Sequence, residues 1–106
     1  MKINEYQLEA LRTAGKADIV NGVLGLCGES GECADMIKKY KFQGHDLDID
    51  HLAKELGDVA WYLAVSAYAI GYDLETIMQM NVDKLRARYP EGFDSSLSQH
   101  RKEGDV

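Results

Sequence analysis

The chain has 106 residues, of which 45% are hydrophobic, and a formal net charge of −6. This length predicts one domain with a small core and favours additional burial through self-association. The acidic balance argues against nucleic acid or an anionic membrane as the main partner, although a metal ion can bridge an acidic protein and a nucleotide. The apolar run 59–70 is too short to span a bilayer. Two isolated cysteines and a polar N-terminus predict a cytoplasmic protein with reduced thiols.

Hydrophobic residues that recur every three or four positions predict four helices. Their expected ranges are about 5–11, 19–40, 49–70 and 74–89. Each is preceded by a residue that can cap its N-terminus: Asn4 (with Gln7 placed at N3), Asp18, Asp48 or Asp50, and Asp73. The second half of the third helix is apolar nearly all round, which places it at the centre of the fold or in a subunit interface. The helical domain is expected to cover residues 1–93, and a polar, flexible tail to cover 94–106.

Four glycines interrupt the second predicted helix at every third position: Gly22, Gly25, Gly28 and Gly31. Glycine inside a helix costs about 1 kcal/mol relative to alanine. Close approach of another helix or of a ligand offsets such a cost. The pattern is not a phosphate-binding loop, because no strand precedes it and no Gly-Lys-Ser/Thr follows it.

Two acidic pairs carry the strongest chemical signal. Glu29 and Glu32 lie three residues apart in the second helix, and Glu55 and Asp58 lie three residues apart in the third. At this spacing both side chains of a pair project from one face of a helix. One such pair alone is usually a solvated surface. Two pairs on consecutive helices, each placed with glycine among apolar residues, predict a site for a hard divalent cation such as Mg²⁺.

Other polar residues share the faces of these pairs. Asn21 lies in line with the first pair, and Tyr62 follows the second pair by one turn. In the fourth helix, Asn81, Lys84 and Arg88 share one stripe. Antiparallel packing of the helices would gather carboxylates, an amide and cations in one pocket. Carboxylates hold metal, and metal and cations hold phosphate oxygens, so this set predicts a phosphoanhydride hydrolase.

Several side chains have structural alternatives. Lys38 lies in the last turn of the second helix, where it is either solvated or able to reach a phosphate, and it is kept as a substrate-binding candidate. Trp61 is expected in the core. His45, His51 and His100 have no partners at metal-ligand spacing and are assigned no role.

At this point the motifs resemble those of a known family. Glu29-x-x-Glu32, followed after 22 residues by Glu55-x-x-Asp58, is similar to the paired acidic motif of the MazG-like all-α nucleoside triphosphate pyrophosphohydrolases. The segments 21–32 and 55–63 resemble the second and third helices of that family. The segment 81–93 resembles the closing segment of its compact branch.

The resemblance implies an all-α protein with a compact four-helix core that assembles as a dimer or a dimer of dimers. It implies Mg²⁺, or Mn²⁺, held by Glu29, Glu32, Glu55 and Asp58. The implied reaction is hydrolysis of a nucleoside triphosphate between the α and β phosphates, giving monophosphate and pyrophosphate. Either Glu32 or Glu55 would orient or deprotonate the attacking water.

The resemblance also implies that the fourth-helix residues contact phosphate and that the tyrosine lies near the sugar. The predicted substrate-binding residues are Asn21, Lys38, Tyr62, Asn81, Lys84 and Arg88. The expected role is removal of non-standard or surplus (deoxy)nucleoside triphosphates. The alternative is a non-catalytic helical module that binds metal or nucleotide on the same scaffold without turnover. The presence of all four acidic residues favours the enzyme.

Overall fold

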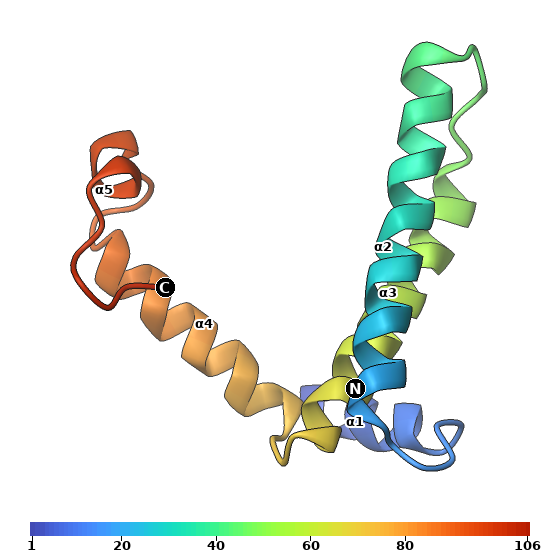
Figure 1. The fold of residues 1–106 in the computed structure, drawn as a ribbon, viewed down its shortest axis with the longest axis horizontal. Helices are drawn as coiled ribbons and strands as arrows, with labels where there is room; N and C mark the ends of the chain where they lie inside the picture. The colour runs from blue at the N-terminus through green and yellow to red at the C-terminus, as the bar shows by residue number, and fades with distance from the viewer. The chain divides into compact units, whose positions relative to one another are not determined.

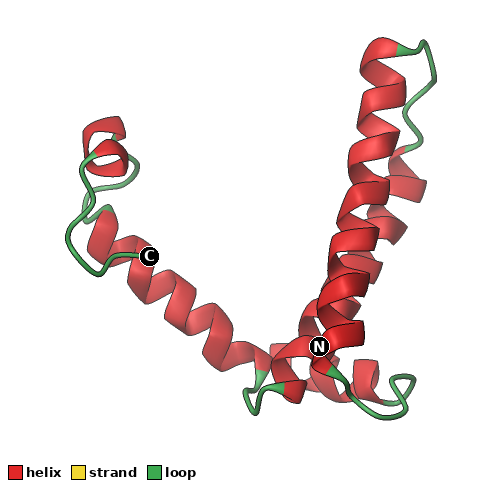
Figure 2. Cartoon of the chain, in the orientation of Figure 1, coloured by secondary structure: helices red, strands yellow, loops and turns green.

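The computed structural model describes residues 1–106 and contains five helices and no strands. They are α1 (Ile3–Leu11), α2 (Ile19–Phe42), α3 (Ile49–Ala69), α4 (Leu74–Arg88) and α5 (Ser95–Gln99) (Figures 1 and 2). The all-α prediction is therefore confirmed. None of these helices combines the length and the apolar character that a membrane span requires.

The chain divides into two compact units, Met1–Leu74 and Glu75–Val106. In the first unit, α2 and α3 pack side by side along their length as a hairpin, and α1 packs against α3 (Figure 1). The sequence predicts α4 in the same core, but α4 belongs mainly to the second unit. Only Leu74 of this helix is buried, whereas Met80 and Val82 remain exposed. A helix that keeps its large apolar side chains exposed adds little to a core.

Capping side chains and glycines set the ends of α2 and α3. Asp18 accepts hydrogen bonds from the backbone N–H groups of the first turn of α2, and Asp48 does the same for α3. These two predicted caps are confirmed, and Asp48 rather than Asp50 is the cap of α3. Beyond the helix ends, Gly44 and Gly71 adopt φ angles of +72° and +88°, a left-handed conformation that glycine adopts without strain.

The predicted cap of the first helix is wrong. Helix α1 begins at Ile3, so Asn4 lies inside its first turn and Lys2 is the N-cap residue. The backbone N–H of Lys2 donates to Glu5 Oε2 at 3.0 Å. Glu5 therefore satisfies one of the free donors at the helix start, in the place where the sequence analysis expected Gln7.

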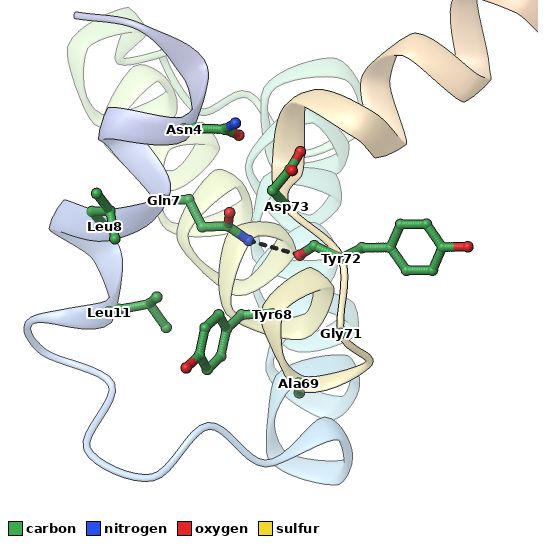
Figure 3. A pocket seen from close by; sticks show the side chains of 9 residues that line it. All are labelled: Asn4, Gln7, Leu8, Leu11, Tyr68, Ala69, Gly71, Tyr72 and Asp73. Carbon is green, nitrogen blue, oxygen red and sulfur yellow. Dashed lines mark hydrogen bonds between the residues drawn. The ribbon is translucent and has the colours of Figure 1, made fainter.

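Gln7 instead joins three parts of the N-terminal unit. Its side chain is buried, with 5% of the residue exposed, in the wall of the pocket between α1 and the end of α3 (Figure 3). Nε2 donates to the backbone carbonyls of Ala64 at 3.1 Å and Tyr72 at 3.2 Å. Oε1 accepts from the N–H of Leu74 at 3.1 Å. One amide thus ties α1 to the body of α3 and to the turn that follows it.

The core around this amide is small. The buried residues Ala10, Ala64, Val65 and Leu74 form one cluster. Half-buried side chains pack against it, and they include Trp61, as the sequence predicts. Because most of these buried side chains are small, the helices of this unit can pack close together.

Two of the four glycines of α2 mark where α3 approaches most closely. A Cβ atom on Gly22 would overlap Ser66, and one on Gly25 would overlap the ring of Tyr62. By contrast, a Cβ on Gly28 or Gly31 would have no neighbour within 4 Å. The prediction that another helix approaches these glycines closely is confirmed for Gly22 and Gly25. It is wrong for Gly28 and Gly31 within this chain.

We expect opposite effects of alanine at these two kinds of site. Gly25→Ala forces the Tyr62 ring away from α2 and should destabilise the fold by about 2 kcal/mol. Gly28→Ala, three residues further along, meets open space and should stabilise the helix by about 0.5 kcal/mol. Urea unfolding of both variants measures the difference. Equal changes of the same sign would show that helix propensity alone governs both sites.

The C-terminal unit includes the segment 94–106, for which the sequence predicts a flexible tail. As predicted, α4 ends at Arg88, directly before Tyr89-Pro90. Asp94 then caps α5 by accepting from the N–H groups of its first turn. Further on, Asp105 forms an ion pair with Arg88 at 2.7 Å. A cap and an ion pair between residues 17 positions apart thus organise the segment 94–106, and composition alone did not reveal them.

Candidate metal centre

The α2–α3 hairpin brings three of the predicted metal ligands together. Glu29 and Glu32 lie one turn apart in α2, and Glu55 lies opposite them in α3. One carboxylate oxygen from each residue lies within 4.8 Å of the others. The side chain of Glu55 is 14% exposed, so this cluster is partly shielded from water. Three acids at this separation cannot all be ionised without strong mutual repulsion.

The cluster responds to that repulsion by retaining protons. A hydrogen bond with Glu55, aided by burial and by the neighbouring acidic charges, raises the pKa of Glu29 to about 7. The pKa of Glu32 is also raised, first by its hydrogen bond with Glu55. The same hydrogen bond with Glu29 lowers the pKa of Glu55, which is therefore the ionised acceptor of the group.

Two buried oxygens in this cluster have no hydrogen-bond partner, namely Glu29 Oε2 and Glu55 Oε2. An unpartnered buried carboxylate oxygen carries a large desolvation cost. A divalent cation would compensate for it, and an all-oxygen donor set is the one that Mg²⁺ and Mn²⁺ prefer. The residues present therefore fit such an ion.

Asp58, the fourth predicted ligand, lies outside the group of close oxygens. Asp58 is exposed and lies three positions after Glu55 in α3. Its negative charge nevertheless contributes to the raised pKa values of Glu29 and Glu32. The pKa of Tyr6 is raised mainly by burial, and the negative charge of Asp58 adds to this shift. Asp58 thus lies near the cluster, and its role as a ligand remains a prediction.

A concave site of about 260 Å³ opens beside the cluster. Glu32, Asp35 and Lys39 line it from α2, and Glu55 lines it from α3. Lys39 Nζ contacts Asp35 Oδ2 at 2.7 Å, whereas the predicted Lys38 lies 3.5 Å from the same carboxylate and does not line the site. The geometry therefore favours Lys39 over Lys38 as the cation that faces the carboxylates.

His51 is a site residue that the sequence analysis missed. Its Nε2 lies 3.2 Å from Glu55 Oε1, and its side chain also lines the concave site. The two residues are four positions apart in α3, which is the spacing of neighbours on one helix face. This i,i+4 relation to an acidic residue is the signal by which the sequence could have identified His51.

Two further predicted substrate-binding residues, Tyr62 and Asn21, do not line this concave site. Tyr62 packs against Gly25, and its ring meets Trp61 edge to face at 4.9 Å. Trp61 is held in turn by a hydrogen bond from Nε1 to Thr13 Oγ1 at 3.0 Å. Asn21 is exposed in the first turn of α2 and does not line the concave site.

The predicted phosphate-binding residues of α4 belong to the C-terminal unit. Asn81 and Lys84 are exposed there, and Arg88 is engaged by Asp105. The acidic cluster belongs to the other unit, Met1–Leu74. Contact of these three residues with a phosphate at the acidic cluster therefore remains a prediction.

The raised pKa of Glu29 has a consequence for stability. Between about pH 4.5 and about pH 7 the folded metal-free protein holds a proton that the unfolded chain has released. The free energy of unfolding should therefore fall as pH rises through this window. Mg²⁺ favours the ionised carboxylates and should reverse the trend near neutral pH. Urea unfolding at about pH 5 and about pH 7.5, with and without Mg²⁺, measures both effects. A Glu29→Gln protein with the same pH slope would contradict this assignment.

The helical hairpin with a cluster of acidic side chains defines an all-α protein with a candidate divalent-metal site. Residues 21–93 match the model of the MazG nucleotide pyrophosphohydrolase domain. The chain is also 35% identical over 114 residues to the Gene 37 protein of Mycobacterium phage L5, in an alignment that covers 95% of this chain and 100% of the phage protein. No solved structure shows significant similarity to it. The chain belongs to the MazG nucleotide pyrophosphohydrolase family.

Proposed function

We propose that this protein is a Mg²⁺-dependent nucleotide pyrophosphohydrolase. It would cleave the α–β phosphoanhydride of (deoxy)nucleoside triphosphates, releasing monophosphate and pyrophosphate, and remove surplus or non-standard nucleotides in the cytoplasm. The observation that supports this best is the carboxylate cluster, in which buried oxygens of Glu29 and Glu55 have no hydrogen-bond partner.

In this proposal Glu29, Glu32 and Glu55 hold the ion, with Asp58 as the fourth candidate. When bound, Mg²⁺ or Mn²⁺ would neutralise negative charge on the phosphates and lower the pKa of a water molecule bound to it. The contact with His51 engages Glu55 Oε1 and orients that side chain. Glu32 is exposed toward the concave site, so of the two predicted candidates it is better placed to accept the proton of the attacking water.

The substrate side of the proposal relies on cations. Lys39 lines the concave site next to the carboxylates and would contact a phosphate oxygen after exchanging its partner Asp35. Lys84 and Arg88 would contact the remaining phosphates, and Tyr62 the sugar. The net charge of −6 makes such local cations necessary for an anionic substrate.

We further propose that the chain acts as a dimer or a dimer of dimers. Large apolar side chains are exposed on all three long helices. They include Val20, Leu24, Leu56, Tyr68, Met80 and Val82. Extended apolar surface on a small chain is typical of a subunit interface. Sedimentation equilibrium gives the oligomeric state directly, and a monomer at every concentration would remove this part of the proposal.

Product analysis tests the reaction. The purified protein is incubated with a panel of ribo- and deoxyribonucleoside triphosphates and Mg²⁺, and pyrophosphate and free phosphate are assayed separately. We expect pyrophosphate with monophosphate, lost on chelation. Free phosphate instead would mean attack at the γ phosphorus and would overturn the proposed reaction.

A non-catalytic metal- or nucleotide-binding module is the alternative. The position of Asp58 outside the close group of oxygens favours it, because a cluster of three ligands can bind an ion without the full catalytic set. A rise in melting temperature with Mg²⁺ would demonstrate binding to the folded state. That rise, without product from any nucleotide, would select the module over the enzyme.

A further inference from the structure

The two carboxylate oxygens of Glu55 have different surroundings. Oε1 lies 3.2 Å from Nε2 of His51, which is four positions earlier in α3. Oε2 is buried and has no hydrogen-bond partner. The whole side chain is only 14% exposed, so the solvent has little access to it. One oxygen is therefore already engaged within the chain, and the other is available to an ion in the candidate metal centre.

The direction of the hydrogen bond between His51 and Glu55 follows from the chemistry of the two groups. A carboxylate that holds a metal ion is ionised and can only accept hydrogen bonds. Nε2 of His51 must then carry the hydrogen, so the imidazole donates to Glu55 Oε1. The positive end of this N–H points at Oε1 and repels a cation that approaches the same oxygen. His51 thus makes Oε1 the less favourable of the two oxygens for an ion.

The start of α3 holds His51 in place for this contact. Its backbone N–H donates to Asp48 Oδ1 at 3.0 Å, which anchors the residue in the first turn of the helix. From there the side chain reaches Glu55, its neighbour on the same helix face. The His51 side chain also lines the concave site beside the carboxylates. The helix N-terminus therefore positions the imidazole against the carboxylate of Glu55.

The number of oxygens that Glu55 offers matters, because divalent cations differ in the coordination they accept. Ca²⁺ takes about six to eight oxygen ligands and often binds both oxygens of one carboxylate, whereas the smaller Mg²⁺ requires near-octahedral geometry and keeps several waters. We infer that His51 restricts Glu55 to one metal-coordinating oxygen, and that this restriction makes the centre select Mg²⁺ over Ca²⁺. His51 is then a positioning residue that sets ion specificity. The inference rests on the proposed metal centre, but it does not require nucleotide hydrolysis.

Isothermal titration of the full-length protein with MgCl₂ and, separately, with CaCl₂ tests the inference without any substrate. The side chain of His51 is 56% exposed, so His51→Ala should fold. In this variant Mg²⁺ binding should weaken about tenfold, because the carboxylate loses the hydrogen bond that positions it. Ca²⁺ binding should be retained, because the second oxygen of Glu55 becomes available to it. The preference for Mg²⁺, given by the ratio of the two dissociation constants, should therefore fall about tenfold.

Two further variants separate ion specificity from a general loss of structure. His51→Gln keeps a hydrogen-bond donor four positions before Glu55 and should retain most of the preference for Mg²⁺. His45→Ala removes an imidazole that lines the adjoining hollow but not the site beside the carboxylates, and it should bind both ions like the unmodified protein. Equal weakening of both ions in His51→Ala, or the same loss of preference in His45→Ala, would overturn the inference.

The titrations also distinguish this inference from the proposed reaction. Absence of Mg²⁺ binding to the unmodified protein would overturn the inference together with the proposed metal centre. Binding with the expected change of preference in His51→Ala, but without hydrolysis of any nucleotide, would overturn the proposed reaction alone.

Discussion

Glu55→Gln should lower nucleotide hydrolysis by about a hundredfold or more, because it removes a carboxylate charge from the centre of the proposed metal site. Glu55 is the ionised member of the cluster, hydrogen-bonded by both acids of α2 and lying 3.2 Å from His51 Nε2. The substitution keeps the size and the hydrogen-bonding shape of the side chain. Steady-state assays over a range of Mg²⁺ concentrations would show the loss together with a weaker response to the metal.

The same variant should leave the metal-free fold intact. The amide of glutamine keeps an oxygen that can accept hydrogen bonds from Glu29 and Glu32, so the melting temperature without Mg²⁺ should lie close to that of the unmodified protein. Asp50→Asn is the matched control, since it neutralises an exposed acid of the same helix outside the cluster and should retain activity. A Glu55→Gln protein that unfolds without metal would reveal a structural role instead.

Gln7→Leu should lower the free energy of unfolding by about 3 kcal/mol, because buried backbone groups lose their hydrogen-bond partner. The amide of Gln7 donates to the carbonyls of Ala64 and Tyr72 and accepts from the N–H of Leu74, and Figure 3 shows its bond to Tyr72. Leucine has a similar volume but offers neither a donor nor an acceptor. Urea unfolding would measure the loss as a lower midpoint at an unchanged slope.

A surface substitution on the same helix provides the comparison. Glu9→Gln breaks an exposed ion pair with Arg12 and should change stability by less than about 0.5 kcal/mol. If Gln7→Leu unfolded at the same urea concentration as Glu9→Gln, the amide would contribute no more than a surface contact. Gln7→Glu adds a test of direction. It keeps an acceptor for Leu74 but turns a carboxylate toward two carbonyls, so it should be at least as destabilising as leucine.

The sequence predicts the parts of the site that depend on helix periodicity. The spacing of Glu29, Glu32 and Glu55, together with the caps Asp18 and Asp48, places three acids on facing sides of two helices, and the structure brings them together. This agreement arises because side-chain direction in a helix follows from position in the chain. The close approach of α3 was predictable for only some of the glycines. The sequence does not distinguish the buried Gly22, which contacts α3, from the exposed Gly28 and Gly31.

Contacts between distant positions were not predictable in this way. Gln7 satisfies donors and acceptors 57 to 67 positions away, and nothing in its local sequence distinguishes it from a capping residue. The pairing of Arg88 with Asp105 depends on the turn made by the chain after α4. Tertiary context decided both of these cases. His51 could have been predicted from the sequence, because it lies four positions before Glu55 on the same helix face.

The short connection 43–48 between α2 and α3 has a consequence for how the protein folds. Contacts that close a short loop form early, because little chain entropy is lost in making them. The hairpin therefore brings its like charges together during an early step of folding, while much of the chain is still unfolded. Relief of that repulsion should accelerate folding as well as slow unfolding. In this protein the divalent ion would thus raise the rate at which the helices that hold it form, as well as the stability of their folded state.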